Sequence, residues 1–147
     1  MIILDANVLL YAYDATSPHH EPARRWLERA LGAPAPVGLP WASVLAFLRI
    51  ATNPRALQRP LTLEAALVIV DSWLEQPCVT IVGPGPRHYQ ILRDVLRSAQ
   101  AKGPLVSDAH LAALAFEHGA TLATSDRDFS RFDGLQVVNP LREPAPG

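Results

Sequence analysis

Three aspartates stand at points of the sequence where elements of an α/β protein would end or begin. Asp5 directly follows the apolar run at 2–4, Asp126 follows the β-prone stretch at 121–124, and Asp108 opens an amphipathic helical stretch. Carboxylates gathered at one mouth repel each other, and a divalent cation relieves that repulsion. A hard cation held by few carboxylates can also bind a phosphate oxygen and activate water for attack on a phosphodiester. The pattern therefore predicts a site for Mg²⁺ or Mn²⁺ with hydrolytic chemistry.

Each acid also has a purely structural explanation. Asp108 could complement the dipole at a helix N-terminus, which is worth roughly 0.3–1 kcal/mol. Asp126 and Asp128 could make a turn. Asp5 is hardest to explain in this way, because a carboxylate directly after a buried strand costs desolvation free energy unless something binds it. Taken together, the positions favour the metal site.

The elements that must position these acids alternate between short apolar runs and helical periodicity. Helices are expected at 8–13, from Ser17-Pro18 to 31, at 42–52, 62–76 and 87–101, and from a Ser107 cap to about His118; strands are expected at 2–4, 37–39, 78–82, 121–124 and 136–138. This alternation predicts a three-layer α/β/α domain with a mostly parallel sheet. Ligands of such sheets bind at the carboxyl ends of the strands, which is where the acids stand.

The helix expected at 62–76 begins with a clear capping signal. Thr62 has the right residue type for the N-cap. The apolar residues that follow at helical spacing form the expected buried stripe, made of Leu63, Ala66, Leu67, Val70 and Leu74.

Length and composition indicate an ordinary globular protein. The chain has 147 residues, of which 49% are hydrophobic and 18% charged, which suits one domain over residues 1–141 with a frayed, proline-rich tail at 142–147. Cys78 is the only cysteine, which excludes an intramolecular disulfide and agrees with a cytoplasmic location. No apolar run approaches the length of a membrane span.

The charge balance gives no global attraction to nucleic acid. The formal net charge is −1, so a polyanionic substrate would need local basic groups. Two arginine clusters could contact phosphates, although solvated helix faces explain them equally simply: Arg24, Arg25 and Arg29, and Arg49, Arg55 and Arg59.

The acids lie within three motifs that carry a family resemblance. Leu4-Asp5-Ala6-Asn7-Val8-Leu9-Leu10, the stretch 108–115 beginning Asp108-Ala109-His110, and Ala123-Thr124-Ser125-Asp126-Arg127-Asp128-Phe129 resemble, in this order, the acidic motifs of PIN-domain nucleases. The similarity is specifically to the VapC-type toxins of bacterial toxin–antitoxin pairs. The stretches 49–54 and 139–141 resemble the actinobacterial branch of these toxins.

This resemblance implies a Mg²⁺- or Mn²⁺-dependent endoribonuclease that cuts tRNA or rRNA, is held inactive by a small VapB-like antitoxin and forms a homodimer. It implies that Asp5, Asp108 and Asp126 are the catalytic metal ligands. Asn7 would orient Asp5 or a water, and Asp128 would be an accessory acid. Thr124 or Ser125 would hold a water or a phosphate oxygen, unless it only caps the end of the strand.

One residue departs from the family pattern and keeps other interpretations open. Family members usually carry a glutamate where this chain has Ala46, which cannot bind a metal. Glu117 cannot replace it, because nine residues of helix separate it from Asp108 by about 13.5 Å. The alternative is a weak or inactive PIN-like module that binds RNA or a partner.

Two further interpretations have less support. A phosphatase or receiver-like domain would use Asp5 as nucleophile, but the sequence offers no second acid two residues later. His88 and His110 are candidate general bases, but a metal-activated water needs no histidine, and His110 is expected to face a neighbour or a partner chain.

Overall fold

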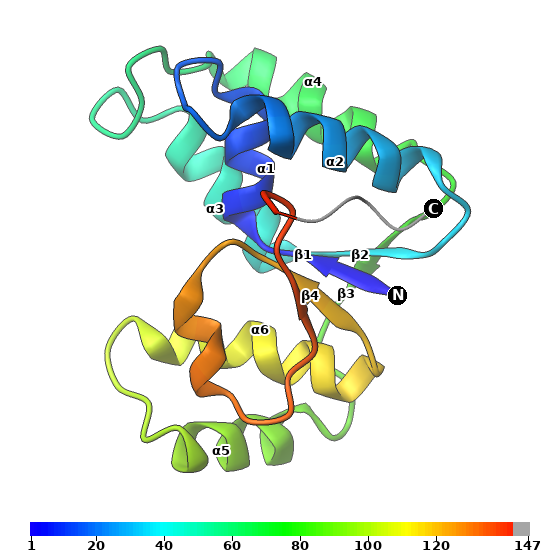
Figure 1. Ribbon diagram of the computed structural model, residues 1–147, viewed down its shortest axis with the longest axis vertical. Helices are drawn as coiled ribbons and strands as arrows, with labels where there is room; N and C mark the ends of the chain where they lie inside the picture. Colours follow the sequence, from blue (N-terminus) through cyan, green and yellow to red (C-terminus); the bar gives the residue numbers. More distant parts are fainter. Residues whose placement is uncertain (143–147) are drawn as a thin grey trace.

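The central sheet of the computed structural model, which describes residues 1–142, is parallel throughout (Figure 1). Its strands are β1 (Ile2–Leu4), β2 (Val37–Pro40), β3 (Val79–Val82), β4 (Thr121–Ala123) and β5 (Val137–Val138). They lie in the order β3-β2-β1-β4-β5, and each neighbouring pair is parallel. The α/β fold predicted from the sequence is confirmed.

Helices cover both faces of this sheet. On one face lie α1 (Ala6–Tyr13), α2 (His20–Gly32), α3 (Trp41–Ala51) and α4 (Leu63–Leu74), and on the other lie α5 (His88–Ser98) and α6 (Leu105–His118). Each side has its own apolar core. One includes Trp26, Phe47 and Trp73, and the other includes Leu114 and Phe129. The result is the expected three-layer arrangement.

The strand order creates a switch point between β1 and β4. From β1 the chain builds outward through β2 and β3, and it then crosses to the other side of β1 to form β4 and β5. Crossover connections diverge at such a point and leave a crevice at the carboxyl ends of the two strands. Leu4 is paired with Ala123 in the register, so the residues that follow, Asp5 and Thr124, leave the sheet side by side.

The start of α6 differs from the prediction. We expected Ser107 to cap this helix, but the helix begins at Leu105 and Ser107 lies within its first turn. Gly103 turns the chain with a φ of 60°, and Pro104 already has helical backbone angles, with φ −59° and ψ −26°. Proline is well suited to the start of a helix, because the N–H that it lacks would have no partner there.

The buried face of α4 also differs in part from the predicted stripe. Thr62 caps the helix as expected, and its hydroxyl accepts a hydrogen bond from the Ala65 amide at 3.1 Å. However, Leu63 is 59% exposed and Leu74 41% exposed, while Trp73 is buried. The Trp73 ring packs edge-on against Phe47 with centroids 4.7 Å apart, and this large contact sets which face turns inward.

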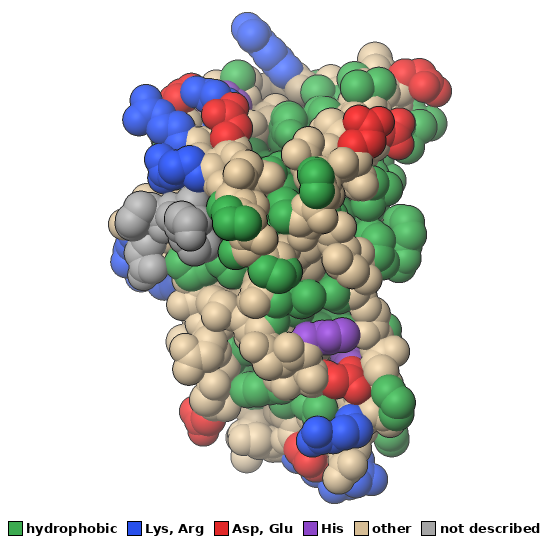
Figure 2. All heavy atoms as spheres, turned by 90° about the vertical axis from the view of Figure 1, so that its right-hand side faces the viewer, with side chains coloured by type: hydrophobic (Ala, Val, Ile, Leu, Met, Phe, Trp, Pro, Cys, Tyr) green, Lys and Arg blue, Asp and Glu red, His purple; other side chains and the backbone are tan. Residues whose placement is uncertain are grey.

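The surface on the side of the chain's N-terminus is mixed in charge. Figure 2 shows basic and acidic side chains near both ends of this view, with a largely uncharged band between them. This distribution agrees with the net charge of −1 and offers a polyanion no single basic field on this side.

Two sequence expectations concern the membrane and the tail. None of the helices in the part of the chain that the structure describes has the length and apolar character to cross a membrane. The frayed tail was predicted for residues 142–147, of which 143–147 lie outside the described residues; Arg142 is described, and its amide donates to the Asn139 carbonyl at 3.1 Å.

Candidate active site

Three carboxylates meet at the switch point. Asp108, Asp126 and Asp128 each place one carboxylate oxygen so that these oxygens lie within 4.8 Å of one another. Asp108 comes from the first turn of α6. Asp126 caps the short 3-10 helix η1 (Arg127–Arg131) by accepting the Asp128 amide at 2.9 Å. The turn that the sequence suggested is therefore present, and it coexists with the acidic cluster.

The surroundings of Asp108 make its ionisation more costly. The pKa of Asp108 is raised from 3.8 to about 6, first by partial burial and then by the negative charges of Asp126, Asp5 and Asp128. Hard oxygen ligands at this spacing fit a divalent cation, since two oxygens on opposite sides of such an ion are about 4 to 5 Å apart. The donor set and the electrostatics thus both suit a bound cation.

Asp5 lies beside this cluster and is not one of its three members. One carboxylate oxygen accepts the Ala6 amide at 2.7 Å and so caps α1, which begins two residues earlier than predicted. The other accepts the Thr124 hydroxyl at 2.7 Å. Burial raises the pKa of Asp5, the two hydrogen bonds lower it, and the charge of Asp126 raises it. Asp5 is therefore a half-buried acid held in place next to the cluster.

Thr124 connects the residues that follow the two central strands. Its buried hydroxyl donates to Asp5 and accepts from the Asn7 side-chain amide at 3.2 Å and from the Asp126 amide at 3.0 Å. Asn7 accordingly acts on Asp5 through Thr124, and its amide oxygen accepts the Ser125 amide at 3.4 Å. This hydroxyl has no further proton to donate to a substrate, so its role here is to position other groups.

Ala46, which stands where the resemblance implied a glutamate, lies on the face of α3 that is turned toward the end of β1. Ser43, which is buried in α3, donates its hydroxyl to the Leu4 carbonyl at 2.6 Å. Ala46 lies three residues further and therefore shares this face of the helix, and it is half-buried. A side chain at Ala46 would point toward the region of Asp5, but alanine contributes no ligand.

Glu117 has a different partner. Its carboxylate accepts the amides of Gly85 at 2.8 Å and Arg87 at 3.0 Å, and so holds the loop that leads into α5. These hydrogen bonds, with a smaller effect from His88 and His118, lower the pKa of Glu117. Glu117 is thus occupied away from the carboxylates, in agreement with its exclusion as a replacement ligand. Nothing in its sequence context indicated this capping role.

The two candidate histidines contact each other. His88 Nε2 and His110 Nδ1 are 3.0 Å apart, which joins α5 to α6. Burial, followed by the charge of His88, lowers the pKa of His110. As predicted, His110 faces a neighbour.

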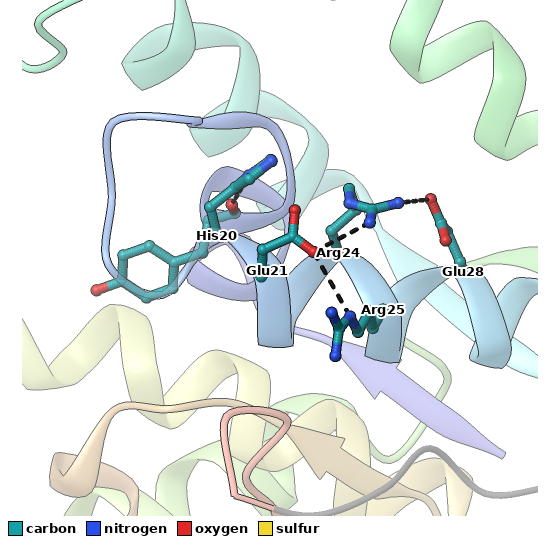
Figure 3. A network of polar contacts seen from close by, with 6 residues as sticks. His20, Glu21, Arg24, Arg25 and Glu28 are labelled. Atoms are coloured by element: carbon teal, nitrogen blue, oxygen red, sulfur yellow. Dashed lines mark hydrogen bonds and ion pairs between the residues drawn. The ribbon is translucent and has the colours of Figure 1, made fainter.

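Two of the three arginines of α2, Arg24 and Arg25, are paired with acids of the same helix (Figure 3). Arg24 bonds Glu28 at 2.6 Å and Glu21 at 3.0 Å, and Arg25 lies 3.5 Å from Glu21. The charges of these two arginines are therefore largely offset within α2, which supports the solvated-face interpretation for Arg24 and Arg25.

Comparison with known proteins gives the family. The PIN domain family matches residues 2–135, which include all the acids described above. The chain is a PIN-domain protein. It is 47% identical over 140 residues to the ribonuclease VapC37 of Mycobacterium tuberculosis, covering 95% of this chain and 97% of the relative. It is also 41% identical to VapC31 of the same species, over 95% of this chain and 99% of that relative. The chain therefore belongs to the VapC group of the PIN family.

Solved structures share the fold at low sequence identity. VapC20 of Mycobacterium tuberculosis, described as a toxin that cleaves the sarcin-ricin loop, matches with a TM-score of 0.67 and 17% identity over 95% of this chain and all of that one. VapBC2 of Rickettsia felis, solved bound to a fragment of promoter DNA, matches with a TM-score of 0.68 and 17% identity over 95% and 98% of the two chains. The α/β/α fold of the PIN family is thereby confirmed for this protein.

Proposed function

We propose that this protein is the toxin of a type II toxin–antitoxin pair, a Mg²⁺- or Mn²⁺-dependent endoribonuclease that cuts tRNA or rRNA. The observation that carries the proposal is the group of three carboxylate oxygens within 4.8 Å at the switch point of a PIN domain. The 47% identity to a ribonuclease over almost the full length supports the same activity.

Asp108, Asp126 and Asp128 would hold the cation, with Asp5 beside them. A bound divalent cation would supply positive charge for a phosphate oxygen and a lowered pKa for an attacking water. The protein's own contribution is to hold the acids in position. Thr124 fixes Asp5 and the Asp126 amide, and Asn7 supports Thr124.

The non-catalytic alternative rests on Ala46 alone. The three carboxylates gather without an acid at that position, so the chain retains a donor set for a cation. Similarity to several ribonucleases over 95% of the chain also favours the enzyme.

The proposed partners follow from the relatives. A VapB-like antitoxin is the expected inhibitor, because the solved neighbours include VapBC2 and a toxin–antitoxin complex from Klebsiella pneumoniae. We further propose a homodimer acting in the cytoplasm. Sedimentation equilibrium of the purified chain would measure the dimer directly, and a monomer at micromolar concentration would contradict it.

The decisive experiment is cleavage by the purified chain, free of antitoxin. Total tRNA and rRNA fragments are incubated with Mg²⁺ or Mn²⁺, with parallel reactions in EDTA and with Asp108→Asn. Asp71→Asn, an exposed acid on α4, is the matched control. We expect discrete products from the wild type and the control, and none with EDTA or Asp108→Asn. Intact RNA with a folded wild type, or cleavage that persists in EDTA, would overturn the proposal.

A further inference from the structure

Two hollows lie side by side next to the carboxylate cluster, and they differ in charge. The larger, about 720 Å³, is lined by residues that include Asp126, Asp133 and Arg127. The smaller, about 350 Å³, is lined within the described residues 1–142 by His19, Ser125, Arg127, Asn139, Leu141 and Arg142, and none of these six carries a carboxylate. A phosphate group would be repelled by the acids of the first and attracted by the bases of the second.

The smaller hollow is assembled from distant parts of the chain. His19 precedes α2, Arg127 begins η1, and Arg142 follows β5. The His19 ring packs edge-on against Tyr11 with centroids 4.9 Å apart. At Arg142, the backbone is fixed by the hydrogen bond from its amide to Asn139. The basic groups are therefore brought together by the fold and were not evident as a cluster in the sequence.

The arginine nearest the site is available to a ligand. Within residues 1–142, Arg127 takes part in no salt bridge, unlike Arg24 and Arg25 of α2, which pair with glutamates (Figure 3). A guanidinium that is not paired with a carboxylate can bind phosphate oxygens with two parallel hydrogen bonds.

The two hollows share a wall made of Ser125, Arg127 and Asn139. Arg127 also follows Asp126 directly in the chain. A nucleic acid strand whose scissile phosphate lies at the carboxylates can therefore pass over uncharged Ser125 and Asn139 into the basic hollow.

We propose that His19, Arg127 and Arg142 form a binding site for a phosphate of the RNA backbone next to the scissile one. This inference rests on the proposed ribonuclease function and adds how a chain with a net charge of −1 holds a polyanion. The site compensates locally for the repulsion between the RNA and the acidic cluster.

The test compares RNA affinity at several salt concentrations. A fluorescent single-stranded oligoribonucleotide is titrated with protein in EDTA, between about 50 and 200 mM salt, with fluorescence anisotropy as the readout. The variants are Arg127→Gln, Arg142→Gln and the double variant. Arg131→Gln is the matched control, because Arg131 lies on the same 3-10 helix but does not line the smaller hollow.

Loss of this one phosphate contact in the double variant should weaken binding and reduce the slope of log affinity against log salt by about 0.7. In cleavage reactions with Mg²⁺, the double variant should raise KM with little change in kcat, and Arg131→Gln should change neither. His19→Gln provides a second, independent test through KM.

Other outcomes would overturn the inference in distinguishable ways. If the wild type cleaves RNA and the double variant has an unchanged KM and salt slope, the phosphate site is wrong and the ribonuclease stands. If the double variant loses affinity for a polyglutamate peptide but not for RNA, the hollow binds an acidic protein segment. If the folded wild type neither binds nor cleaves RNA, both proposals fail.

Discussion

The hydroxyl of Thr124 is the most connected polar group of the site. It joins Asp5, Asn7 and the Asp126 amide, and it is buried. A buried acceptor that loses its donor keeps its desolvation cost, so the loss of this hydroxyl should destabilise the hydrogen bonds at Asp5, Asn7 and Asp126 together.

Thr124→Val should therefore lower both stability and activity. The side chain keeps its shape and loses the hydroxyl, which leaves one carboxylate oxygen of Asp5 and the Asp126 amide without a hydrogen-bond partner. We expect a loss of about 1–3 kcal/mol in the free energy of unfolding, measured by urea denaturation. Thr124→Ser, which keeps the hydroxyl, should lose much less. Equal losses in the two variants would mean that packing of the methyl group, and not the hydroxyl, stabilises this corner.

Ala46 offers a gain-of-function test at a single residue. Ala46→Glu should add a carboxylate on the face of α3 that lies against the end of β1, and should tighten Mn²⁺ binding in a calorimetric titration. Leu45→Glu adds the same charge to the same helix at a position that is 61% exposed, and should leave binding unchanged. No difference between the two variants would place Ala46 outside the site.

Among the elements, the loop before α5 depends on a single carboxylate. Glu117 accepts the Gly85 and Arg87 amides there, and its pKa is lowered from 4.5. A carboxyl group whose pKa is lower in the folded state than in the unfolded state stabilises the fold at pH values above its unfolded-state pKa. That stabilisation is lost as pH falls through 4.5 toward the folded pKa.

Glu117→Gln should accordingly destabilise the protein at pH 7 and matter less near pH 4. The measurement is the difference in urea midpoint between wild type and variant at the two pH values. Glu75→Gln, at an exposed position, should show little difference at either. A gap that stays constant with pH would show that the charge of Glu117 is not what holds the loop.

The elements also show which features a sequence can predict. Most strands and helices could be predicted from the spacing of apolar residues, because an element that buries one face must place its apolar residues on that face. The start of α6 could not be predicted in this way. Ser107 is a residue type that often caps helices, but the chain already has helical backbone angles at Pro104. Leu63 and Leu74 of α4 fitted a stripe as well as Trp73 does, and only the contact with Phe47 shows which face is buried.

The expected carboxyl ends of the strands predicted where the site lies, but they did not predict which residues form hydrogen bonds within it. Asp108 and Asp126 followed from their positions, whereas the hydrogen bonds that fix Asp5 at Thr124 depend on the register of β1 with β4. The basic hollow could not be predicted, because His19, Arg127 and Arg142 are far apart in the sequence.

At the scale of the whole molecule, a bound cation should stabilise the fold. A ligand that binds only the folded state adds about 2.7 kcal/mol at one hundred times its dissociation constant. Mg²⁺ or Mn²⁺ should therefore raise the Tm of the wild type and of Asp71→Asn, but not that of Asp126→Asn. In EDTA, Asp108→Asn should melt no lower than the wild type, because one of the repelling charges is gone. A Tm that does not respond to either ion would contradict the metal site.

The pairing of β1 with β4 has a consequence during protein synthesis. Ile2 is paired with Thr121, so β1 can pair with β4 only after the ribosome has added more than a hundred further residues. Pairing across such separations is slow, because the intervening chain must lose entropy before the contact forms. A ribosome that stops before residue 121 releases a chain without Asp126 and Asp128. Translation products that end before residue 126 would thus lack two of the three acids, and the complete cluster would form only after β4 has been made and has paired with β1.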